Sequence, residues 1–388
     1  MNRRSFVMSG LTALSATRVI GANDRVRLGI IGTGGRGRLL MRQANKEPNI
    51  QWVALCDAWD ERCYQGAELA DESAKQYRDY RKLLDHTDID GVIVATWDNN
   101  HAWLTQKVCE SGKDAYVEKP MTNLPEEGLP LVRTVKKTNR IVQVGMQQRS
   151  IEGFVEAKEK IIDTGMLGKI HMVRTLWNGN GGYLAKVPKG MEQKPKDLDW
   201  EACLGKLPKK PWDPKMYFNR FSYWDLSCGG MSGGLFVHLV DVVHWYLNLE
   251  KAKSAVALGG IYHHKDGRTI PDTINFIVDY PQDINVTFEA SVDGLGKADI
   301  VFIGDLGELS IFRGGYTYTP TKQNTDAAEI KGSGGNDLHM HNWVDCIQTR
   351  KQPNADAIQG HYSSMACHIG NIAYQEKRRV NWRKEWDV

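Results

Sequence analysis

The most constraining feature of this chain is a glycine-rich turn that follows a short apolar run. Residues 26–31 read VRLGII, the next six read GTGGRG, and a helical pattern follows. This order of strand, GxGxxG turn and helix is typical of a βαβ unit that binds a dinucleotide. Gly32 permits the tight turn, Gly34 lets the backbone approach a pyrophosphate at the helix N-terminus, and Gly37 lets the helix lie close to the strand. The predicted cofactor residues of this turn are Gly32, Thr33, Gly34, Gly35, Arg36 and Gly37.

A carboxylate after the next predicted strand indicates which dinucleotide is bound. Residues 50–56 (IQWVALC) form a second apolar run, and Asp57 follows it directly. An acidic residue about 20 positions past the last glycine accepts hydrogen bonds from the ribose hydroxyls and repels a 2′-phosphate. The sequence therefore predicts NAD as the cofactor, in preference to NADP.

The alternation of predicted strands and helices gives the fold class. Over residues 24–146 strands and helices take turns, which predicts an NAD-binding Rossmann domain with a doubly wound parallel sheet. Residues 147–335 carry strands with period-two patterning, which predicts an α/β domain with an open, mostly antiparallel sheet for substrate binding and oligomerisation. An irregular insertion, 178–231, interrupts this domain, and residues 336–388 return to helices that we expect to pack back on the core. The fold class is α/β.

The N-terminal segment is typical of an export signal. Residues 3–6 read RRSF, a moderately apolar stretch follows, and residues 20–22 (IGA) offer a cleavage site. We predict a twin-arginine-type signal peptide over residues 1–22 and a periplasmic or other extracytoplasmic location. A disordered basic tail is the alternative.

Charge and composition exclude several classes of partner. Lysine and arginine number 50 against 47 acidic residues, so the formal net charge is only +3, and no basic block is present. This balance argues against nucleic acid and anionic membranes as partners. No apolar run is long enough for a membrane span. The seven cysteines show no CxxC spacing, so we predict neither a disulfide framework nor a metal site.

Three further motifs carry a family resemblance. Glu118-Lys119-Pro120 follows the predicted fifth strand, Asn100-His101-Ala102 precedes it, and residues 238–241 read HLVD. With the glycine turn, this combination resembles the glucose–fructose oxidoreductase/inositol dehydrogenase family (Gfo/Idh/MocA), from Arg25 to the tail. The resemblance implies a homo-oligomer, a dimer or tetramer formed through the open sheet. The cofactor residues that we expect beyond the turn and Asp57 are Thr96, Asn99, His101, Glu118, Lys119 and Gln147.

The resemblance also implies that Lys119 and His238 flank the sugar hydroxyl that is oxidised. Imidazole is suited to removing the hydroxyl proton, and an ammonium group beside the same oxygen favours the developing alkoxide. The plainer alternatives are a surface cation for Lys119 and a satisfied helix histidine for His238.

One position departs from the family pattern. Many members carry an aspartate four residues before the histidine, where this chain has Gly234. Asp241, at i+3 from His238, lies on the same helical side and could orient the ring as part of the catalytic group. It could equally be a buried structural carboxylate. The glycine leaves room, so we expect either altered proton chemistry or a larger substrate or a metal in the vacated space.

The insertion and the tail supply the expected substrate contacts. Aromatic faces stack on the apolar side of sugar rings, and the insertion is rich in tyrosine and tryptophan. We expect Tyr183 and Trp224 to contact a carbohydrate or glycoside, with His341 approaching from the tail. The alternative is that these aromatics only pack a long loop.

Export restricts the reactions that an NAD enzyme can catalyse. Free NAD is a cytoplasmic compound, so an exported enzyme cannot exchange its cofactor for fresh NAD. The first hypothesis is an oxidoreductase that acts on a sugar or sugar derivative with tightly bound, internally recycled NAD. The second is an NAD-dependent glycoside hydrolase or lyase that works by transient oxidation, elimination, water addition and re-reduction. A weaker third possibility is a non-catalytic sugar-binding relative.

Overall fold

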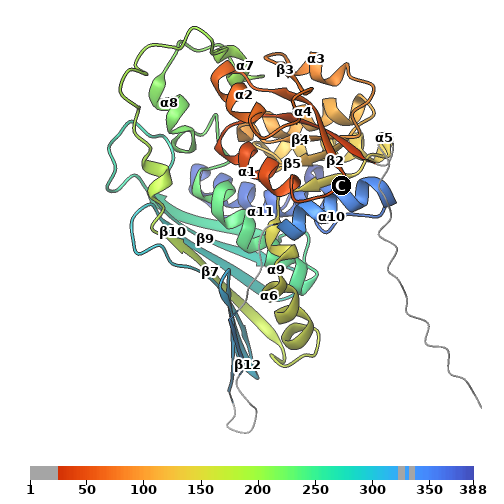
Figure 1. Ribbon diagram of the computed structural model, residues 1–388. Helices are drawn as coiled ribbons and strands as arrows, with labels where there is room; N and C mark the ends of the chain where they lie inside the picture. The colour runs from red at the N-terminus through yellow and green to blue at the C-terminus, as the bar shows by residue number, and fades with distance from the viewer. Residues whose placement is uncertain (1–24, 322–327, 332–336) are drawn as a thin grey trace, which may run out of the picture.

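The computed structural model describes residues 25–321, 328–331 and 337–388 (Figure 1). The predicted signal peptide, residues 1–22, lies outside the described residues. Two parts of the predicted second domain, 322–327 and 332–335, also lie outside them. Within the described ranges, no helix combines the length and the apolar character needed to cross a membrane.

The first sheet is a doubly wound parallel sheet, as predicted. Its strands are β1 (Val26–Ile31), β2 (Ile50–Cys56), β3 (Lys75–Tyr77), β4 (Gly91–Val94), β5 (Asp114–Val117) and β6 (Val142–Val144). They are ordered β3-β2-β1-β4-β5-β6 and pair in parallel throughout. β4 and β5 are buried along their whole length, because helices cover both faces of the sheet. The strand order reverses between β1 and β4, which is where open α/β sheets bind ligands.

The helices of this lobe follow its strands in turn. They are α1 (Gly35–Ala44), α2 (Asp60–Ala67), α3 (Tyr80–Leu84), α4 (Asp98–Glu110) and α5 (Gly128–Thr138). α4 begins at Asp98, four residues after the end of β4. This start places Asp98 near the carboxyl end of the sheet, beside the reversal point.

The second sheet has nine strands within the described residues. They are β7 (Ile170–Asn178), β8 (Ser254–Gly260), β9 (Thr273–Tyr280), β10 (Ile284–Ser291), β11 (Ala298–Gly304), β12 (Gly307–Phe312), β13 (Gly315–Pro320), β14 (Ala328–Lys331) and β15 (Val380–Asn381). Their order is β14-β13-β12-β11-β7-β10-β9-β8-β15. Only β7 and β10 pair in parallel, so the sheet is mostly antiparallel, as predicted.

One face of this sheet is covered and the other is exposed. The covering helices include α6 (Glu152–Ala157), α9 (Val237–Leu247) and α11 (Ala357–Glu376). Residues of β9 alternate between buried and more exposed positions, as a strand with one covered face requires. On the open face Leu258 and Ile277 are 81% and 46% exposed. The oligomer expected through this face stays a prediction.

The C-terminal segment ties the two lobes together. α10 (Asp337–Thr349) packs Met340 and Trp343 into the apolar cluster beneath β1 and β2. α11 contacts α5 of the first lobe and α9 of the second, and β15 joins the second sheet beside β8. The helices of residues 336–388 therefore pack back on the core.

The insertion, residues 178–231, forms its own small apolar cluster against the first lobe. It contains two short helices, α7 (Trp200–Leu204) and α8 (Pro214–Phe218). Trp200, Trp212 and Tyr217 pack with Trp59 and Trp97 of the first lobe. Figure 1 shows α7 beside α2, with α8 farther out on the same side of the first lobe. The insertion thus covers the carboxyl ends of the parallel strands.

Candidate active site

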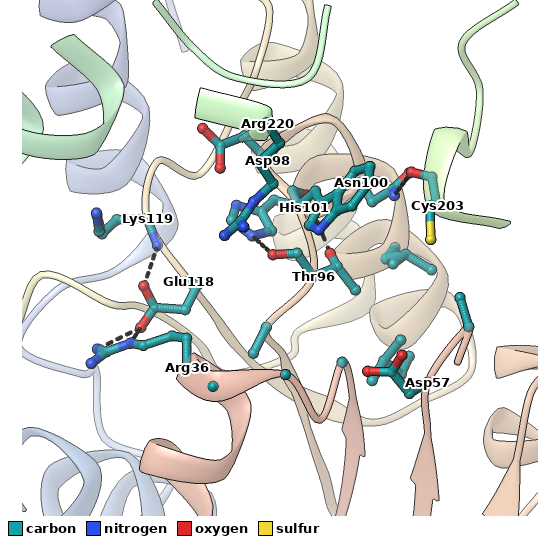
Figure 2. A pocket seen from close by; sticks show the side chains of 18 of the residues that line it. Arg36, Asp57, Thr96, Asp98, Asn100, His101, Glu118, Lys119, Cys203 and Arg220 are labelled. Atoms are coloured by element: carbon teal, nitrogen blue, oxygen red, sulfur yellow. Dashed lines mark hydrogen bonds and ion pairs between the residues drawn. The ribbon is translucent and has the colours of Figure 1, made fainter. Parts of the chain in front are cut away.

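A cavity of about 530 Å³ lies between the carboxyl ends of the first sheet, the insertion and α9. Such a volume suits an organic ligand. Figure 2 shows Asp57 at one end of this cavity, with Lys119, Glu118 and Arg36 toward the other. The two ends are described in turn below.

The glycine turn forms a backbone cradle at the start of α1. Gly32 has φ 98°, and a Cβ there would lie 2.6 Å from the carbonyl oxygen of Ala95. Gly37 packs so closely that a Cβ would lie 1.9 Å from the carbonyl oxygen of Gly32. Gly34, the N-cap of α1, supplies no side-chain acceptor for the first N–H groups. The residues present therefore fit a dinucleotide pyrophosphate, because unpaired helix N–H groups favour a phosphate.

Two of the turn residues predicted to contact the cofactor act from behind the cavity wall. Thr33 is fully buried, and its hydroxyl donates to the backbone oxygen of Arg62 at 2.8 Å. Gly37 is also absent from the cavity lining, since it packs on Gly32. Thr33 and Gly37 therefore shape the turn. The residues of the turn that line the cavity are Gly32, Gly34, Gly35 and Arg36.

Asp57 is held rigidly at the rim of this cradle. Its Oδ2 accepts a hydrogen bond from the backbone N–H of Thr33 at 2.8 Å, and its Oδ1 accepts one from Trp59 at 2.9 Å. Burial raises the pKa of Asp57, while the Arg62 guanidinium and these hydrogen bonds oppose the rise. Arg62 itself lies over Trp59 and Tyr217, at 5.3 and 5.1 Å from the ring centroids. Asp57 is therefore positioned to receive the ribose hydroxyls.

Glu118 anchors the other end of the cavity. Its Oε1 accepts hydrogen bonds from Arg36 Nε at 2.6 Å and from Gln147 Nε2 at 3.2 Å. Burial would raise the pKa of Glu118, but the charges of Arg36 and Lys119 outweigh it and the pKa is lowered. The carboxylate is therefore ionised and fixed. Gln147 lines the cavity, and its predicted contact with the cofactor stays a prediction.

Lys119 and His238 meet in the cavity although they are far apart in the sequence. Lys119 Nζ donates to the backbone oxygen of Gly234 at 2.7 Å, just before α9, which carries His238. Burial lowers the pKa of Lys119, and the charges of Glu118 and Asp98 oppose this. Burial, then Lys119 and Arg313, hold the pKa of His238 well below its usual range, so the imidazole is neutral. His238 lines the cavity, and its buried Nδ1 has no hydrogen-bond partner among the described residues.

The space expected beside Gly234 is filled by Tyr183. A Cβ on residue 234 would lie 2.0 Å from the hydroxyl oxygen of Tyr183. This corrects the expectation that the glycine leaves room for a larger substrate or a metal. Tyr183 is 8% exposed and packs on Phe221, so its ring supports the cavity wall from behind. It does not face the cavity as a stacking platform.

Asp241 does not orient His238. Its two carboxylate oxygens accept hydrogen bonds from Arg149 Nε at 2.8 Å and Nη2 at 3.0 Å, and Ser363 donates to it at 2.9 Å. Asp241 is fully buried and absent from the cavity lining. These contacts favour the alternative, a buried structural carboxylate, over the catalytic role predicted for Asp241. The reason is that Arg149 reaches it from a distant segment and satisfies the charge.

Three predicted residues near the start of α4, Thr96, Asn99 and His101, divide into two roles. Thr96 and His101 line the cavity, and His101 is held by the backbone oxygens of Pro120 at 2.7 Å and Thr96 at 3.2 Å. Asn99 is not among the residues that line the cavity, so its predicted contact with the cofactor has no support from the cavity. Its amide donates to the backbone oxygen of Leu204 at 2.9 Å, and so fastens the insertion. Asn100, the next residue, lines the cavity instead.

Two predicted substrate residues lie outside the cavity lining. Trp224 donates from its indole to the backbone oxygen of Thr269 at 2.9 Å and stacks on Tyr374. His341 is 64% exposed and pairs with Glu47 at 2.8 Å. The insertion and α10 fold with these side chains turned toward other surfaces, so neither contacts a ligand in this cavity.

The structure adds cavity residues that the sequence motifs do not reveal. Trp177 comes from the end of β7, Arg313 from the turn after β12, and Arg220 from the insertion. Asp98 lies near Arg220 (Figure 2), and the attraction opposes the lowering of the Arg220 pKa by burial. Only Asp98, four residues after the end of β4, had a positional signal in the sequence, because strand ends in such sheets carry site residues.

A separate group of side chains has metal-ligand spacing. His263, His264 and Asp293 place one ligand atom each within 4.8 Å of one another. His264 Nε2 already lies 3.0 Å from an Asp293 oxygen. The group is absent from the cavity lining, so it takes no part in the site above.

Two family models together match almost the whole described chain. The model described as the oxidoreductase family (Gfo/Idh/MocA), NAD-binding Rossmann fold, matches residues 26–146. The model described as the C-terminal alpha/beta domain of the same family matches residues 151–387.

Curated relatives are similar over part of their length. An inositol 2-dehydrogenase/D-chiro-inositol 3-dehydrogenase of Halalkalibacterium halodurans is 33% identical over 151 residues, covering 38% of this chain and 43% of that protein. An inositol 2-dehydrogenase of Salmonella typhimurium is 30% identical over 206 residues, covering 51% of this chain and 59% of that protein. The matched segments thus span about half of these relatives.

Solved structures share the fold over nearly the whole chain. A levoglucosan dehydrogenase in complex with NADH and L-sorbose has a TM-score of 0.73 at 15% identity, covering 92% of this chain and 98% of that one. An aldose-aldose oxidoreductase from Caulobacter crescentus, complexed with glycerol, has a TM-score of 0.72 at 18% identity, covering 92% and 100%. At these identities the likeness concerns the fold alone.

Proposed function

Since the chain belongs to the Gfo/Idh/MocA oxidoreductase family, we propose that it is an NAD-dependent oxidoreductase that acts on a hydroxyl group of a sugar or sugar derivative. The observation that carries this proposal is the convergence of Lys119 and His238 in the cavity that also holds the dinucleotide cradle. The names of the relatives, which concern inositols and sugars, support the substrate class.

The chemistry divides between the dinucleotide and the chain's own residues. Bound in the cradle of Gly32, Gly34 and Gly35 beside Asp57, NAD would supply the hydride acceptor. The neutral imidazole of His238 accepts the proton of the substrate hydroxyl. The Lys119 ammonium, held by the backbone oxygen of Gly234, donates to the same hydroxyl oxygen and stabilises negative charge there.

Preference for NAD over NADP rests on Asp57. Both of its oxygens are oriented by backbone N–H groups, so the carboxylate is fixed at the place where a 2′-phosphate would have to lie. The nearby Arg62 is engaged by Trp59 and Tyr217 and by the charge of Asp57. The repulsion of a phosphate by Asp57 therefore favours NAD.

Tight retention of the cofactor follows from the insertion above the cavity. Asn99 and Asn100 both donate to backbone oxygens of α7, and Asp199 of the insertion donates from its N–H to Ala58 at 2.8 Å. Cys203 and Tyr217 of the insertion line the cavity. A bound dinucleotide would leave only when these contacts open. Because the reduced cofactor would then stay in the cavity between turnovers, a second substrate would reoxidise it in place.

Retention of the cofactor also favours a second candidate, an NAD-dependent glycoside hydrolase or lyase. Such an enzyme oxidises and re-reduces one substrate molecule, so it needs a cofactor that stays bound and produces no net NADH. The non-catalytic sugar-binding alternative is weaker, because the Lys119–His238 pair is intact.

Location and assembly complete the proposal. The twin-arginine-type segment at residues 3–6 supports export of the folded, cofactor-loaded protein to the periplasm. The exposed apolar residues Leu258 and Ile277 on the open sheet face support a homo-oligomer through that face.

One purified sample tests the proposal. The protein is denatured, the released nucleotide is identified by mass, and the native enzyme is then screened against free sugars and nitrophenyl glycosides. Bound NAD and turnover of a sugar with an added aldose or ketose acceptor are the expected results. Release of nitrophenol without NADH would select the glycosidase candidate. Nucleotide-free protein that cannot be loaded with NAD contradicts both.

A further inference from the structure

We propose that the substrate is a sugar acid, whose carboxylate is bound by Arg313 at the catalytic end of the cavity. The inference rests on the proposed function, since it names the substrate class of the same site. It is carried by the position of Arg313 and by the fact that none of the described residues supplies a counter-charge for it.

Arg313 reaches the cavity from the second lobe. It lies in the turn between β12 and β13, and its guanidinium carbon lies 5.3 Å from the ring centroid of Trp177. Both side chains line the cavity, together with Lys119 and His238. The charge of Arg313 contributes to the lowered pKa values of Lys119 and His238, which places it near both.

Arg313 differs from the other cations of the cavity in having no acidic partner within the part of the chain that the structure describes. Arg36 pairs with Glu118 at 2.6 Å, and the charge of Asp57 faces Arg62. The other three also have acidic groups near them: Arg78 with Asp60, and Lys119 and Arg220 with Asp98.

The surroundings of Arg313 are positive instead. Among the described residues it makes no ion pair and no hydrogen bond, and the charge that acts on it is that of Arg36, which repels it. A guanidinium that no carboxylate neutralises raises the local potential and attracts an anionic ligand.

A carboxylate fits this position better than a phosphate. One guanidinium presents a planar pair of N–H groups that matches a carboxylate and neutralises its single charge. A phosphate monoester carries a charge of about −1.5 to −2 and would leave part of it unpaired here. The indole of Trp177, beside Arg313, offers an apolar face for the sugar ring. The carboxylate at Arg313 and the hydroxyl that faces Lys119 therefore belong to one bound sugar.

Matched pairs of ligands test the proposal on the NAD-loaded protein. Binding is measured by calorimetry for D-glucuronate against D-glucose and for D-galacturonate against D-galactose, with D-glucose 6-phosphate as a further probe. Oxidation of each is measured in parallel. The variants are Arg313→Gln and Arg313→Lys. Arg174→Gln is the control, because Arg174 is a 54% exposed β7 residue outside the cavity lining.

In the wild type at least one acid should bind about tenfold or more tightly than its neutral partner, the size expected for hydrogen bonds to a charged group. Arg313→Gln should remove this preference and Arg313→Lys should keep part of it. NAD affinity should be unchanged in both, and Arg174→Gln should behave as the wild type.

Three results would overturn the proposal: equal or absent binding of the acids by the wild type, a preference for the phosphate, or a loss of NAD affinity rather than of acid selectivity in Arg313→Gln. The last would assign Arg313 to the dinucleotide. Failure of the proposed function can be distinguished from failure of this inference. Acid binding that depends on Arg313, without any oxidation, would contradict the proposed function but support the sugar-acid site. Oxidation of neutral sugars without a preference for acids would support the proposed function but contradict the sugar-acid site.

Discussion

The hydroxyl group of Tyr183 occupies the place that a side chain on residue 234 would take. A Cβ on Gly234 would lie 2.0 Å from that hydroxyl oxygen and 3.2 Å from the ring carbon that bears it. The backbone oxygen of Gly234 also accepts the hydrogen bond of Lys119. A steric requirement of the insertion therefore restricts position 234 to glycine, next to Lys119.

Gly234→Ala should disturb the site through this contact. The added methyl group must displace Tyr183 or the segment before α9, and overpacking of this kind costs about 1–3 kcal/mol of folding free energy. We expect lower kcat/KM and a lower denaturation midpoint. Tyr183→Phe removes the hydroxyl, so the double variant should recover most of the stability. Equal losses in the single and double variants would show that Tyr183 is not the obstacle.

Lys119→Met should abolish turnover with the fold intact. Lys119 is the only lysine among the described residues that line the cavity. Charged groups positioned at the reacting atoms contribute about 10²-fold or more to the rate. Single-turnover rates, circular dichroism and NAD content would be compared with the wild type. Lys107→Met, an exposed lysine of α4, is the matched control. Turnover within twofold of the wild type would remove Lys119 from the chemistry.

Asp57→Ala should lower discrimination between NAD and NADP. The variant loses the acceptor for the ribose hydroxyls and the repulsion of a 2′-phosphate, so NAD should bind about 10-fold more weakly, as expected for a charged hydrogen-bond acceptor. NADP binding should be unchanged or stronger, since Arg62 remains. Fluorescence titration of the cofactor-free protein measures both affinities. An unaltered affinity ratio would contradict the ribose role.

Asn99→Ala should accelerate loss of the cofactor without changing the cavity lining. Its amide donates to the backbone oxygen of Leu204 in α7, and a buried carbonyl left unpaired costs about 1–3 kcal/mol. The closed insertion should therefore open more often, and NAD should exchange against labelled NAD several-fold faster. Asn381→Ala, at an exposed position of β15, serves as the control. Identical exchange rates in all three proteins would exclude the insertion as the element that retains NAD.

Stability should decrease in mild acid because of buried histidines. Burial lowers the pKa of His339 from its ordinary value of 6.5 to about 4, although its bond to the Val144 carbonyl opposes this. A depressed histidine pKa means that the folded state binds fewer protons than the unfolded state. The stabilisation is therefore complete above about pH 6.5 and is lost as the pH falls toward 4.

The loss attributable to His339 is about 3 kcal/mol. Denaturant midpoints at pH 7.5, 6, 5 and 4.5 would measure it, with His339→Gln as the comparison. The variant should show a shallower decline with pH. His341→Gln, which changes an exposed histidine two residues away, should follow the wild type. Parallel curves for His339→Gln and the wild type would assign the decline to other groups.

Local patterns in the sequence were sufficient for the architecture and for one end of the site. The apolar run, glycine turn and helix at residues 26–44 depend on interactions between residues that are close in the sequence. The period-two pattern in the strands of the second lobe indicates which face of each strand is buried. Asp57, Glu118 and Lys119 directly follow predicted strands, and parallel strands end at one edge of a sheet. Their common location was therefore predictable.

Only tertiary packing decided which distant side chains meet. Arg149 and Asp241 are 92 residues apart, and their ion pair withdraws Asp241 from the histidine three positions before it. Likewise the contact of Tyr183 with Gly234, the cover formed by the insertion and the arrival of Arg313 beside Trp177 depend on how separate elements pack. Sequence periodicity specifies the direction of a side chain relative to its own helix or strand. It does not specify the partner on the opposing surface, because that partner is set by the free energy of the whole packed chain.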